Sequence, residues 1–435
     1  MSSRLAKAWF VLSIGIVGVG YGIAANQWNW FPSSFAYRAW NQAQSMSSWF
    51  DPPGTIVRPR VYEEGGSTER KSGIQPGLTL VTSWWEGKKQ VRLIDQTGRT
   101  LHKWEAPGSQ LLPDSLDLAS DPERRVLHGT YLFPNGDLLV NVEYTGTARL
   151  NSCGEVLWRM SEVNHHSIDR ADDGSFWIPA RNTDPESPPS FSGLGEVNSL
   201  KQILRVMEDG EVVDRISVLD ILYSNDLERF LARYGKGTHL NDVDALPDSL
   251  ADEYPLFESG DLAVSLRDVN LVFVFDPESG ELKWHADRPF LRQHDPDFIG
   301  DGWIGIFDNR KEPTERGEML GGSRIIAIQP HTDSTRILFP TERSDPFYTR
   351  IRGKWQMLEN GNMLLTESQA GRVVEVAPSG ETVWEWVHEP FSEKKVPAVT
   401  KATRVDLTRE EVASWPCSSI NSVRTSTANQ QSLSR

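Results

Sequence analysis

Apolar strands and glycine turns alternate along most of this chain. One unit recurs six times: a turn that ends in glycine, two apolar strands, a second glycine turn and a strand that often ends in tryptophan. In the second unit, Asn135-Gly136 precedes the apolar run 138–140, and Gly154 precedes Trp158. Asn-Gly, Asp-Gly and Ser-Gly pairs supply the positive φ that tight hairpins require. Each unit therefore predicts two antiparallel hairpins in series.

Six such units predict an all-β fold, a six-bladed β-propeller with four antiparallel strands in each blade. The tryptophan near the end of the last strand would fill the gap between neighbouring blades. The alternative is a pair of β-sandwiches, which the regular phase of glycine and tryptophan disfavours. Residues 211–258 interrupt the repeat, and the Leu/Phe spacing of 225–234 indicates a helix there.

An uncharged apolar segment occupies residues 8–25. Its 18 residues lie near the lower limit for a helix that crosses a bilayer. Arg4 and Lys7 precede it and no basic residue follows until Arg38, so the positive-inside rule keeps the N-terminus cytoplasmic. We therefore expect a single transmembrane helix with the rest of the chain exported, periplasmic or otherwise extracytoplasmic. The alternative is a cleaved signal peptide, for which residues 22–24 offer a site.

These features divide the chain into four parts. They are a membrane anchor (1–25), an exported linker or stalk (26–75), the propeller (76–395) and a polar C-terminal tail (396–435). Export places the two cysteines in a compartment where disulfides can form. Cys153 lies at a predicted hairpin turn and Cys417 in the tail. A Cys153–Cys417 bond and two free cysteines both remain open.

The composition excludes several functional classes. Among 435 residues, 45 Lys and Arg stand against 60 Asp and Glu, and the net charge of −15 argues against nucleic acid as a partner. Two cysteines cannot make an all-cysteine zinc or iron–sulfur site. The sequence lacks HExxH, GxSxG and GxxxxGK[ST], the last being the phosphate cradle that a nucleotide-dependent sulfotransferase or kinase would need. We expect no cofactor and no metal.

Histidines recur in phase with the repeat. His128, His166 and His294 each stand eight residues before the first glycine of a unit. This position opens the first strand, which in a propeller is innermost and lines the axial channel. His239, displaced by the insertion, can join the same ring. Side chains of successive residues on a strand point in opposite directions, so His165 should point away from its neighbour His166, although we do not exclude His165 from the site.

These histidines have a simpler interpretation as well. A single buried histidine is more often a core residue bonded to a backbone carbonyl than a catalyst, and only the shared register argues otherwise. The other four lie at late or outer positions of their units, and we expect them at the surface: His102, His285, His331 and His388.

Arg267 ends the apolar run 262–267 of the fourth unit, where a lone cation would be costly to bury. A bound anion would resolve this, because guanidinium presents a fork of donors to oxyanions. A salt bridge to Asp268 or Glu281 is the alternative. Convergent imidazoles with an arginine suit either metal binding or the transfer of an anionic group with one histidine as nucleophile.

Five stretches together resemble the bacterial arylsulfate sulfotransferases, over about residues 75–390. The stretches are Asn164-His-His-Ser-Ile-Asp, Thr238-His-Leu-Asn-Asp-Val-Asp, Leu262-Ala-Val-Ser-Leu-Arg267, Gln293-His294 followed by Gly305-Ile-Phe-Asp-Asn309, and Leu364-Leu-Thr-Glu-Ser followed by Gly371-Arg-Val-Val-Glu-Val. Each motif alone is weak, and their order along the shared repeat carries the resemblance.

The resemblance implies a six-bladed propeller that transfers a sulfuryl group from a phenolic sulfate ester to a phenol. No nucleotide donor takes part, and the mechanism is ping-pong through a sulfohistidine. His294 would be the nucleophile, and Arg267 with protonated imidazoles would hold the sulfate. His239, Asn241 and His166 would bind sulfuryl oxygens or assist proton transfer. The remaining substrate contacts would be His165, His128 and Thr366.

The resemblance also bears on partners. The expected partners are the phenolic sulfate donor and the phenol acceptor, with no nucleic acid, and the membrane through the N-terminal helix. Residues 26–75 do not look like the full N-terminal β-domain that some members use for dimer contacts. A homo-oligomer therefore stays open.

Three other functional classes compete with this interpretation. A quinoprotein-like redox enzyme is suggested by residues 275–284, which look like a tryptophan-docking repeat, but such enzymes usually have eight blades and an acidic metal site. A non-catalytic envelope scaffold would keep the propeller without chemistry. A histidine-ligated metal enzyme would use the same imidazoles as ligands.

Overall fold

The computed structural model describes residues 9, 12–22, 56–63, 65–69, 71–106, 125–160, 162–181, 201–234, 238–314 and 316–417. The chain forms two compact units, Met1–Gly54 and Thr55–Arg435. In the first unit, residues 12–22 are helical. None of the helices in the described ranges combines the length and apolar character needed to cross a bilayer. The anchor predicted for residues 8–25 lies partly outside these ranges and stays a prediction.

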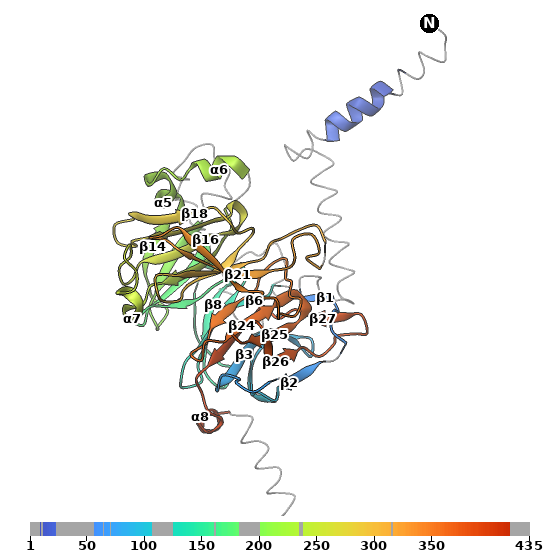
Figure 1. The fold of residues 1–435 in the computed structure, drawn as a ribbon, viewed down its shortest axis with the longest axis vertical. Coiled ribbons are helices and arrows are strands. Elements are labelled where there is room, and N and C mark those ends of the chain that lie inside the picture. The colour runs from blue at the N-terminus through green and yellow to red at the C-terminus, as the bar shows by residue number, and fades with distance from the viewer. Residues whose placement is uncertain are drawn as a thin grey trace, which may run out of the picture. The chain divides into compact units, whose positions relative to one another are not determined.

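Six antiparallel sheets follow one another along the second unit as the blades of a β-propeller, which confirms the predicted fold class (Figure 1). Blade 1 contains β28 (Lys401–Val405), β3 (Leu78–Trp85), β4 (Lys88–Ile94) and β5 (Thr100–Glu105). Blade 2 contains β6 (Leu127–Leu132), β7 (Leu138–Val142), β8 (Gly146–Leu150) and β9 (Val156–Arg159). Blade 3 contains β10 (Val163–Asn164), β11 (Asp169–Arg170), β12 (Phe176–Arg181), β13 (Lys201–Val206) and β14 (Val212–Ser217).

The second half of the ring repeats the same order. Blade 4 contains β15 (Leu240–Ala245), β16 (Leu262–Leu266), β17 (Leu271–Phe275) and β18 (Leu282–Ala286). Blade 5 contains β19 (His294–Phe298), β20 (Ile304–Asp308), β21 (Arg324–Gln329) and β22 (Ser334–Phe339). Blade 6 contains β23 (Trp355–Met357), β24 (Met363–Glu367), β25 (Arg372–Val376), β26 (Thr382–Val387) and, outermost, β2 (Gly66–Glu69).

The C-terminal segment closes the ring, contrary to the polar tail expected from residue 396. Strand β28 pairs with β3, so that Ala402 faces Val81 and the first blade takes its innermost strand from the far end of the propeller. The segment reads as polar because only two of its five residues are apolar. Helix α8 (Arg409–Ser414) follows, and residues 418–435 lie outside the described ranges.

Part of the segment expected to be a linker, residues 26–75, also belongs to the propeller. Strand β1 (Val57–Pro59) pairs with β27 (Lys395–Pro397), and β2 lies beside β26 at the outer edge of blade 6 (Figure 1). Such short strands between polar residues carry no pattern of their own, so the sequence did not reveal them.

Tryptophans join neighbouring blades, as the repeat predicts. Trp104 of blade 1 donates to the carbonyl of Gly136 in blade 2 at 3.2 Å. Trp158 of blade 2 donates to the Glu208 carbonyl in blade 3 at 3.0 Å. Trp384 of blade 6 donates to the Gln96 carbonyl in blade 1 at 2.7 Å. Each indole thus buries apolar area against the next blade while its N–H is satisfied.

A disulfide joins Cys153 to Cys417, with the two Cα atoms 5.2 Å apart. Cys153 lies in the turn between β8 and β9, and Cys417 follows α8. The bond therefore fastens the segment that follows the closing strand to blade 2.

The insertion at 211–258 contains more regular structure than expected. Helix α6 (Arg229–Tyr234) falls within the predicted helix 225–234, and α5 (Val218–Ser224) and α7 (Asp248–Ala251) are additional. Ser217 caps α5 by accepting from the backbone N–H of Asp220 at 3.3 Å. Two single-turn helices, η2 (Arg267–Val269) and η3 (Ser368–Ala370), follow the second strands of blades 4 and 6, β16 and β24.

Candidate active site

Five histidines gather on or beside the inner strands of blades 2 to 5: His128 and His294 lie in β6 and β19, His165 and His166 between β10 and β11, and His239 just before β15. Three inner strands shift register next to a predicted site residue, between Leu127 and Thr130, between Leu240 and Asp242, and between His294 and Pro296. A β-bulge re-aims the side chains beside it. The backbone is also held in the left-handed region at His166 (φ 67°) and His239 (φ 53°), which non-glycine residues rarely adopt.

His294 is fixed by one amide. Its Nδ1 lies 2.6 Å from Oδ1 of Asn309. The amide nitrogen of Asn309 donates to the backbone carbonyls of Thr349 (2.9 Å) and Arg352 (2.6 Å), so its oxygen is the acceptor toward His294. Nδ1 of His294 must therefore carry the proton, and Nε2 holds a lone pair. Among the described residues, this buried Nε2 has no hydrogen-bond partner.

The other imidazoles form a connected group. His165 and His166 meet through their Nδ1 atoms at 2.8 Å, and His166 and His239 meet through their Nε2 atoms at 3.1 Å. The ring of His128 lies 4.3 Å from that of His166, centroid to centroid. His165, expected to point away, is part of the cluster because His166 takes a left-handed backbone and breaks the alternation.

Burial keeps these rings neutral. Desolvation lowers the pKa of His294 to about 3, with the nearby Arg267 guanidinium as the next cause. The pKa values of His128, His165, His166 and His239 also lie well below 6.5, again mainly through desolvation. The protonated imidazoles expected from the sequence are therefore replaced by neutral ones, and positive charge in the site must come from arginine.

Arg267 lies beside the cluster, in η2. Its backbone N–H donates to the His239 carbonyl at 3.1 Å, and its Nε contacts Asp268 at 3.0 Å. The salt bridge weighed as an alternative is therefore present. Asp268 also accepts from Nη1 of Arg292, so one carboxylate is shared by two guanidinium groups.

Arg352 is a site residue that the sequence analysis missed. Its side chain is 7% exposed, its φ is 64°, and its charge lowers the pKa values of His128 and His294. It belongs to an irregular segment before β23, where no strand pattern or repeat position could have marked it.

Asn241 and Thr366 differ in the contacts that their side chains make. Asn241 is 1% exposed and donates to the Gln293 carbonyl at 2.8 Å, while its Oδ1 has no partner among the described residues. Thr366, expected as a substrate contact, instead accepts from the backbone N–H of Ala402 at 3.2 Å. Its hydroxyl ties blade 6 to the closing strand of blade 1.

A narrow cavity of about 10 Å³ lies between the histidines and a layer of buried charges. His128, Asn241 and His294 line one part of it, and Lys354 and Asp295, paired at 2.6 Å, line another. This volume holds about one water, so a phenyl sulfate could enter only after surrounding side chains move. Within the described ranges, no three His, Cys, Asp or Glu side chains are arranged to hold a metal ion.

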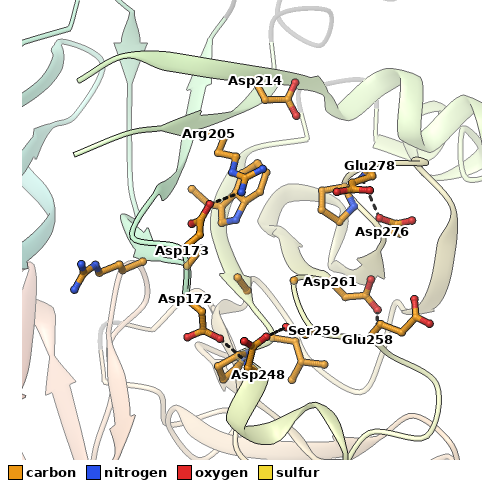
Figure 2. A pocket seen from close by; sticks show the side chains of 18 residues that line it. Asp172, Asp173, Arg205, Asp214, Asp248, Glu258, Ser259, Asp261, Asp276 and Glu278 are labelled. Carbon is orange, nitrogen blue, oxygen red and sulfur yellow. Dashed lines mark hydrogen bonds and ion pairs between the residues drawn. The ribbon is translucent and has the colours of Figure 1, made fainter. Parts of the chain in front are cut away.

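A larger pocket of about 560 Å³ lies between blades 3 and 4 and contains none of the predicted site residues (Figure 2). Carboxylates dominate it, with Asp173 paired to Arg205 and Asp172 accepting from the backbone of Asp248. Its acidity makes it unsuited to an anionic substrate.

Two of the histidines expected at the surface are buried, so that prediction is wrong for them. Nε2 of His102 donates to the Ser152 carbonyl (2.8 Å), and the His102 ring meets that of Trp104 edge-on. His388 stacks on Trp85 with ring centroids 4.7 Å apart. Tryptophans cover both rings: Trp104 of the same strand and Trp415 cover His102, and Trp85 of blade 1 covers His388.

Fold and site together define a six-bladed propeller with a histidine-rich site on its inner strands. The family described as arylsulfotransferase (ASST) matches residues 129–389, more than half of the chain. The chain belongs to the arylsulfotransferase family.

Solved structures resemble the chain at low sequence identity. A protein of unknown function from Bacteroides caccae has 12% identity and a TM-score of 0.45, over 74% of this chain and 99% of that one. TolB from Acinetobacter baumannii has 12% identity and a TM-score of 0.43, over 76% and 67%. A catalytically inactive virginiamycin B lyase from Staphylococcus aureus with quinupristin has 12% identity and a TM-score of 0.41, over 79% and 100%. None of the curated proteins compared matches this chain.

Proposed function

We propose that this protein transfers a sulfuryl group from a phenolic sulfate ester to a phenolic acceptor through a sulfohistidine at Nε2 of His294, without a nucleotide donor. The observation that carries the proposal is the Asn309 contact, which leaves a neutral His294 with its lone pair on Nε2. A neutral imidazole with an unpaired nitrogen is the form that acts as nucleophile.

Two half-reactions carry the sulfuryl group from the donor to the acceptor. Nε2 of His294 forms a bond to sulfur while the ester sulfur–oxygen bond breaks, and the electron pair leaves with the phenolate. In the second half-reaction the acceptor oxygen bonds to sulfur and the electron pair of the nitrogen–sulfur bond returns to Nε2. Sulfuryl transfer spreads negative charge over the oxygens, as phosphoryl transfer does. Arg267 and Arg352 supply the positive charge that stabilises it.

The experiment follows nitrophenolate release from 4-nitrophenyl sulfate, with and without phenol. We expect a burst of about one equivalent without phenol and turnover with it. His294→Ala should lose both, while His331→Ala, which changes an exposed histidine, keeps both. Turnover by the His294→Ala variant would contradict the proposal.

A non-catalytic envelope scaffold is the second candidate, because the cavity beside His294 holds only about one water as it stands. The scaffold predicts no release from any aryl sulfate and no effect of His294→Ala beyond stability. The burst experiment therefore separates the two candidates.

We also propose that residues 8–25 anchor the protein in a membrane and that the propeller lies in an extracytoplasmic compartment. The basic residues before the segment and the Cys153–Cys417 disulfide support this, because structural disulfides are typical of oxidising compartments. A reporter fused after residue 25 should be active only when exported. Activity of a cytoplasm-specific reporter would contradict the topology.

A further inference from the structure

A line of hydrogen-bonded side chains runs from the sulfuryl-transfer site into blade 3. Nζ of Lys201 lies 3.4 Å from Nε2 of His165, Nδ1 of His165 lies 2.8 Å from Nδ1 of His166, and Nε2 of His166 lies 3.1 Å from Nε2 of His239. Lys201, His165 and His166 are buried, and His239 is the partly exposed end. His165 and Lys201 have no part in the chemistry described above.

The chemistry of the four groups fixes the direction of every hydrogen bond. An ammonium group can only donate, so Nε2 of His165 accepts from Lys201. A neutral His165 then carries its proton on Nδ1 and donates to Nδ1 of His166. His166 in turn carries its proton on Nε2 and donates to Nε2 of His239. The proton of His239 is therefore on Nδ1, at the exposed end of the line.

We propose that Lys201, His165, His166 and His239 form a proton relay that protonates the leaving phenolate in the first half-reaction and takes the proton of the acceptor phenol in the second. Lys201 is the reservoir that is discharged between the two steps. This inference rests on the proposed function and adds to it two residues, Lys201 and His165, that act through His239.

The protons balance in the first half-reaction. The phenolate takes the Nδ1 proton of His239, and His239 takes at Nε2 the proton of His166. His166 takes at Nδ1 the proton of His165, and His165 takes at Nε2 one proton of the Lys201 ammonium. Phenol leaves, and Lys201 becomes a neutral amine.

The same line then runs backwards. After the first half-reaction each imidazole carries its proton on the opposite nitrogen, and Nδ1 of His239 holds a lone pair. It can take the proton of the acceptor phenol as the phenol attacks the sulfohistidine, and the shift returns one proton to Lys201. A ping-pong enzyme needs one proton out and one proton in per cycle, which this relay provides without solvent.

The surroundings of Lys201 suit a reservoir that gains and loses a proton near neutrality. The pKa of Lys201 is lowered to about 8, mainly by burial, with Arg181 and Arg267 adding to the effect and Asp268 opposing it. The ring of Tyr144 lies 5.9 Å from Nζ and covers it. His165, which faces Lys201, is neutral.

The position of Arg267 ties the exposed end of the relay to the sulfuryl site. Its backbone N–H donates to the carbonyl of His239 at 3.1 Å, and its charge lowers the pKa values of both His239 and His294. The proton donor and the nucleophile thus lie within the electrostatic influence of the same guanidinium.

The test compares two donors that differ in the acidity of the leaving phenol. Phenyl sulfate releases phenolate, whose conjugate acid has a pKa of about 10, as for a tyrosine phenol. This leaving group depends more on protonation than 4-nitrophenolate does, because 4-nitrophenol is the stronger acid. General acid catalysis contributes roughly 10²–10⁴-fold. Lys201→Met should therefore slow release from phenyl sulfate by about 10²-fold and from 4-nitrophenyl sulfate by less than about tenfold.

Two further variants make the result specific. His165→Gln keeps a polar side chain between Lys201 and His166, but an amide cannot pass a proton by exchanging tautomers, so it should show the same dependence on the leaving group. Lys283→Met is the matched control, because Lys283 is a half-buried lysine paired with Asp261 on blade 4 and it should not discriminate between the donors. Thermal unfolding confirms that each variant is folded.

The outcomes separate the relay from the proposed function. Equal losses with both donors in folded Lys201→Met and His165→Gln, while the wild-type protein turns over, would overturn the relay and leave the sulfotransferase standing. Absence of release from either donor by the wild-type protein would overturn both. Independently of activity, nitrogen NMR of the resting protein should find the His165 proton on Nδ1, and a proton on Nε2 would overturn the relay.

Discussion

His294 exposes 2% of its surface and holds Nδ1 against the Asn309 oxygen, so its chemistry follows from burial and one hydrogen bond. Burial makes the imidazole neutral, and Asn309 decides which nitrogen carries the proton. The guanidinium groups of Arg267 and Arg352 lie close enough to lower the pKa of His294. The nucleophile is neutral and its neighbours are cationic because their side chains differ in kind, although they lie close together.

The Asn309 contact is testable on its own. Asn309→Ala removes the acceptor for Nδ1, so His294 can carry its proton on either nitrogen and can rotate. Leaving a buried donor without its acceptor costs about 1–3 kcal/mol, and we expect the burst rate to fall roughly 10- to 100-fold with little change in KM. Stopped-flow release of nitrophenolate measures this. An unchanged burst rate would show that Asn309 does not orient the ring.

Buried neutral histidines also make stability depend on pH. Their pKa values are lowered in the folded protein, so the unfolded chain binds more protons below about pH 6.5, and stability falls as pH falls through this value. Asp242, whose pKa burial raises to about 7, works in the opposite direction. A variant that lacks one of these histidines shows how much that histidine contributes to the pH dependence of the unfolding free energy.

We expect His166→Gln to flatten the dependence of unfolding free energy on pH between about 4.5 and 6 by about 1.4 kcal/mol per pH unit. Urea unfolding at several pH values measures the slope. A slope equal to that of the wild-type protein would mean that His166 is protonated in the fold.

At the scale of the elements, indoles join blade 1 to 2, blade 2 to 3 and blade 6 to 1, and inner-strand carboxylates join blade 3 to 4 and blade 4 to 5. Asp169 of β11 accepts from the Ala245 N–H in β15 at 3.0 Å, and Asp244 of β15 accepts from the Phe298 N–H in β19 at 3.0 Å. These bonds hold neighbouring inner strands in register. The histidines at the ends of the same strands are positioned by the same contacts.

The tryptophans between blades should stabilise the fold in proportion to how deeply they are buried. Trp104 is 1% exposed, and Trp104→Ala should lower the unfolding free energy by about 3–5 kcal/mol because it leaves a cavity between blades 1 and 2. Trp158 is only partly buried, so Trp158→Ala should cost less. Chemical denaturation measures the unfolding free energy of both variants. Equal losses of unfolding free energy would contradict the expectation that the more deeply buried tryptophan stabilises the fold more.

The repeat was readable from sequence wherever a local pattern carries it. Glycine turns and apolar strands repeat in each blade, so six blades and the shared position of His128, His166 and His294 could be predicted. β28 could not, because a strand paired with residues some 320 positions away needs no apolar run of its own. Arg352 and Lys201 could not either, because their roles depend on side chains from other blades.

At the scale of the whole molecule, the ring is closed by a strand and a covalent bond. β28 pairs with β3, and Cys153–Cys417 fastens the following segment to blade 2 across a sequence separation of 264 residues. Neither cysteine lines the cavity beside the histidines, whereas Lys401 of β28 does. Stability and catalysis should therefore respond separately to removal of the disulfide.

We expect Cys153→Ser with Cys417→Ser to lower the unfolding free energy by about 2–5 kcal/mol, because the open chain gains conformational entropy when it unfolds. The rate of sulfuryl transfer at low temperature should stay within a factor of about two. Calorimetry and steady-state turnover measure the two effects. A large loss of turnover in the folded variant would show that ring closure shapes the site.

In the proposed function, His294 carries the sulfuryl group between donor and acceptor. The most direct measurement is peptide mass spectrometry of the protein mixed rapidly with 4-nitrophenyl sulfate in the absence of phenol and quenched in alkali. We predict one sulfuryl group per chain, located on His294 and removed when phenol is added before the quench. Nitrophenolate release without a modified His294, or the modification on another residue, would contradict the claim.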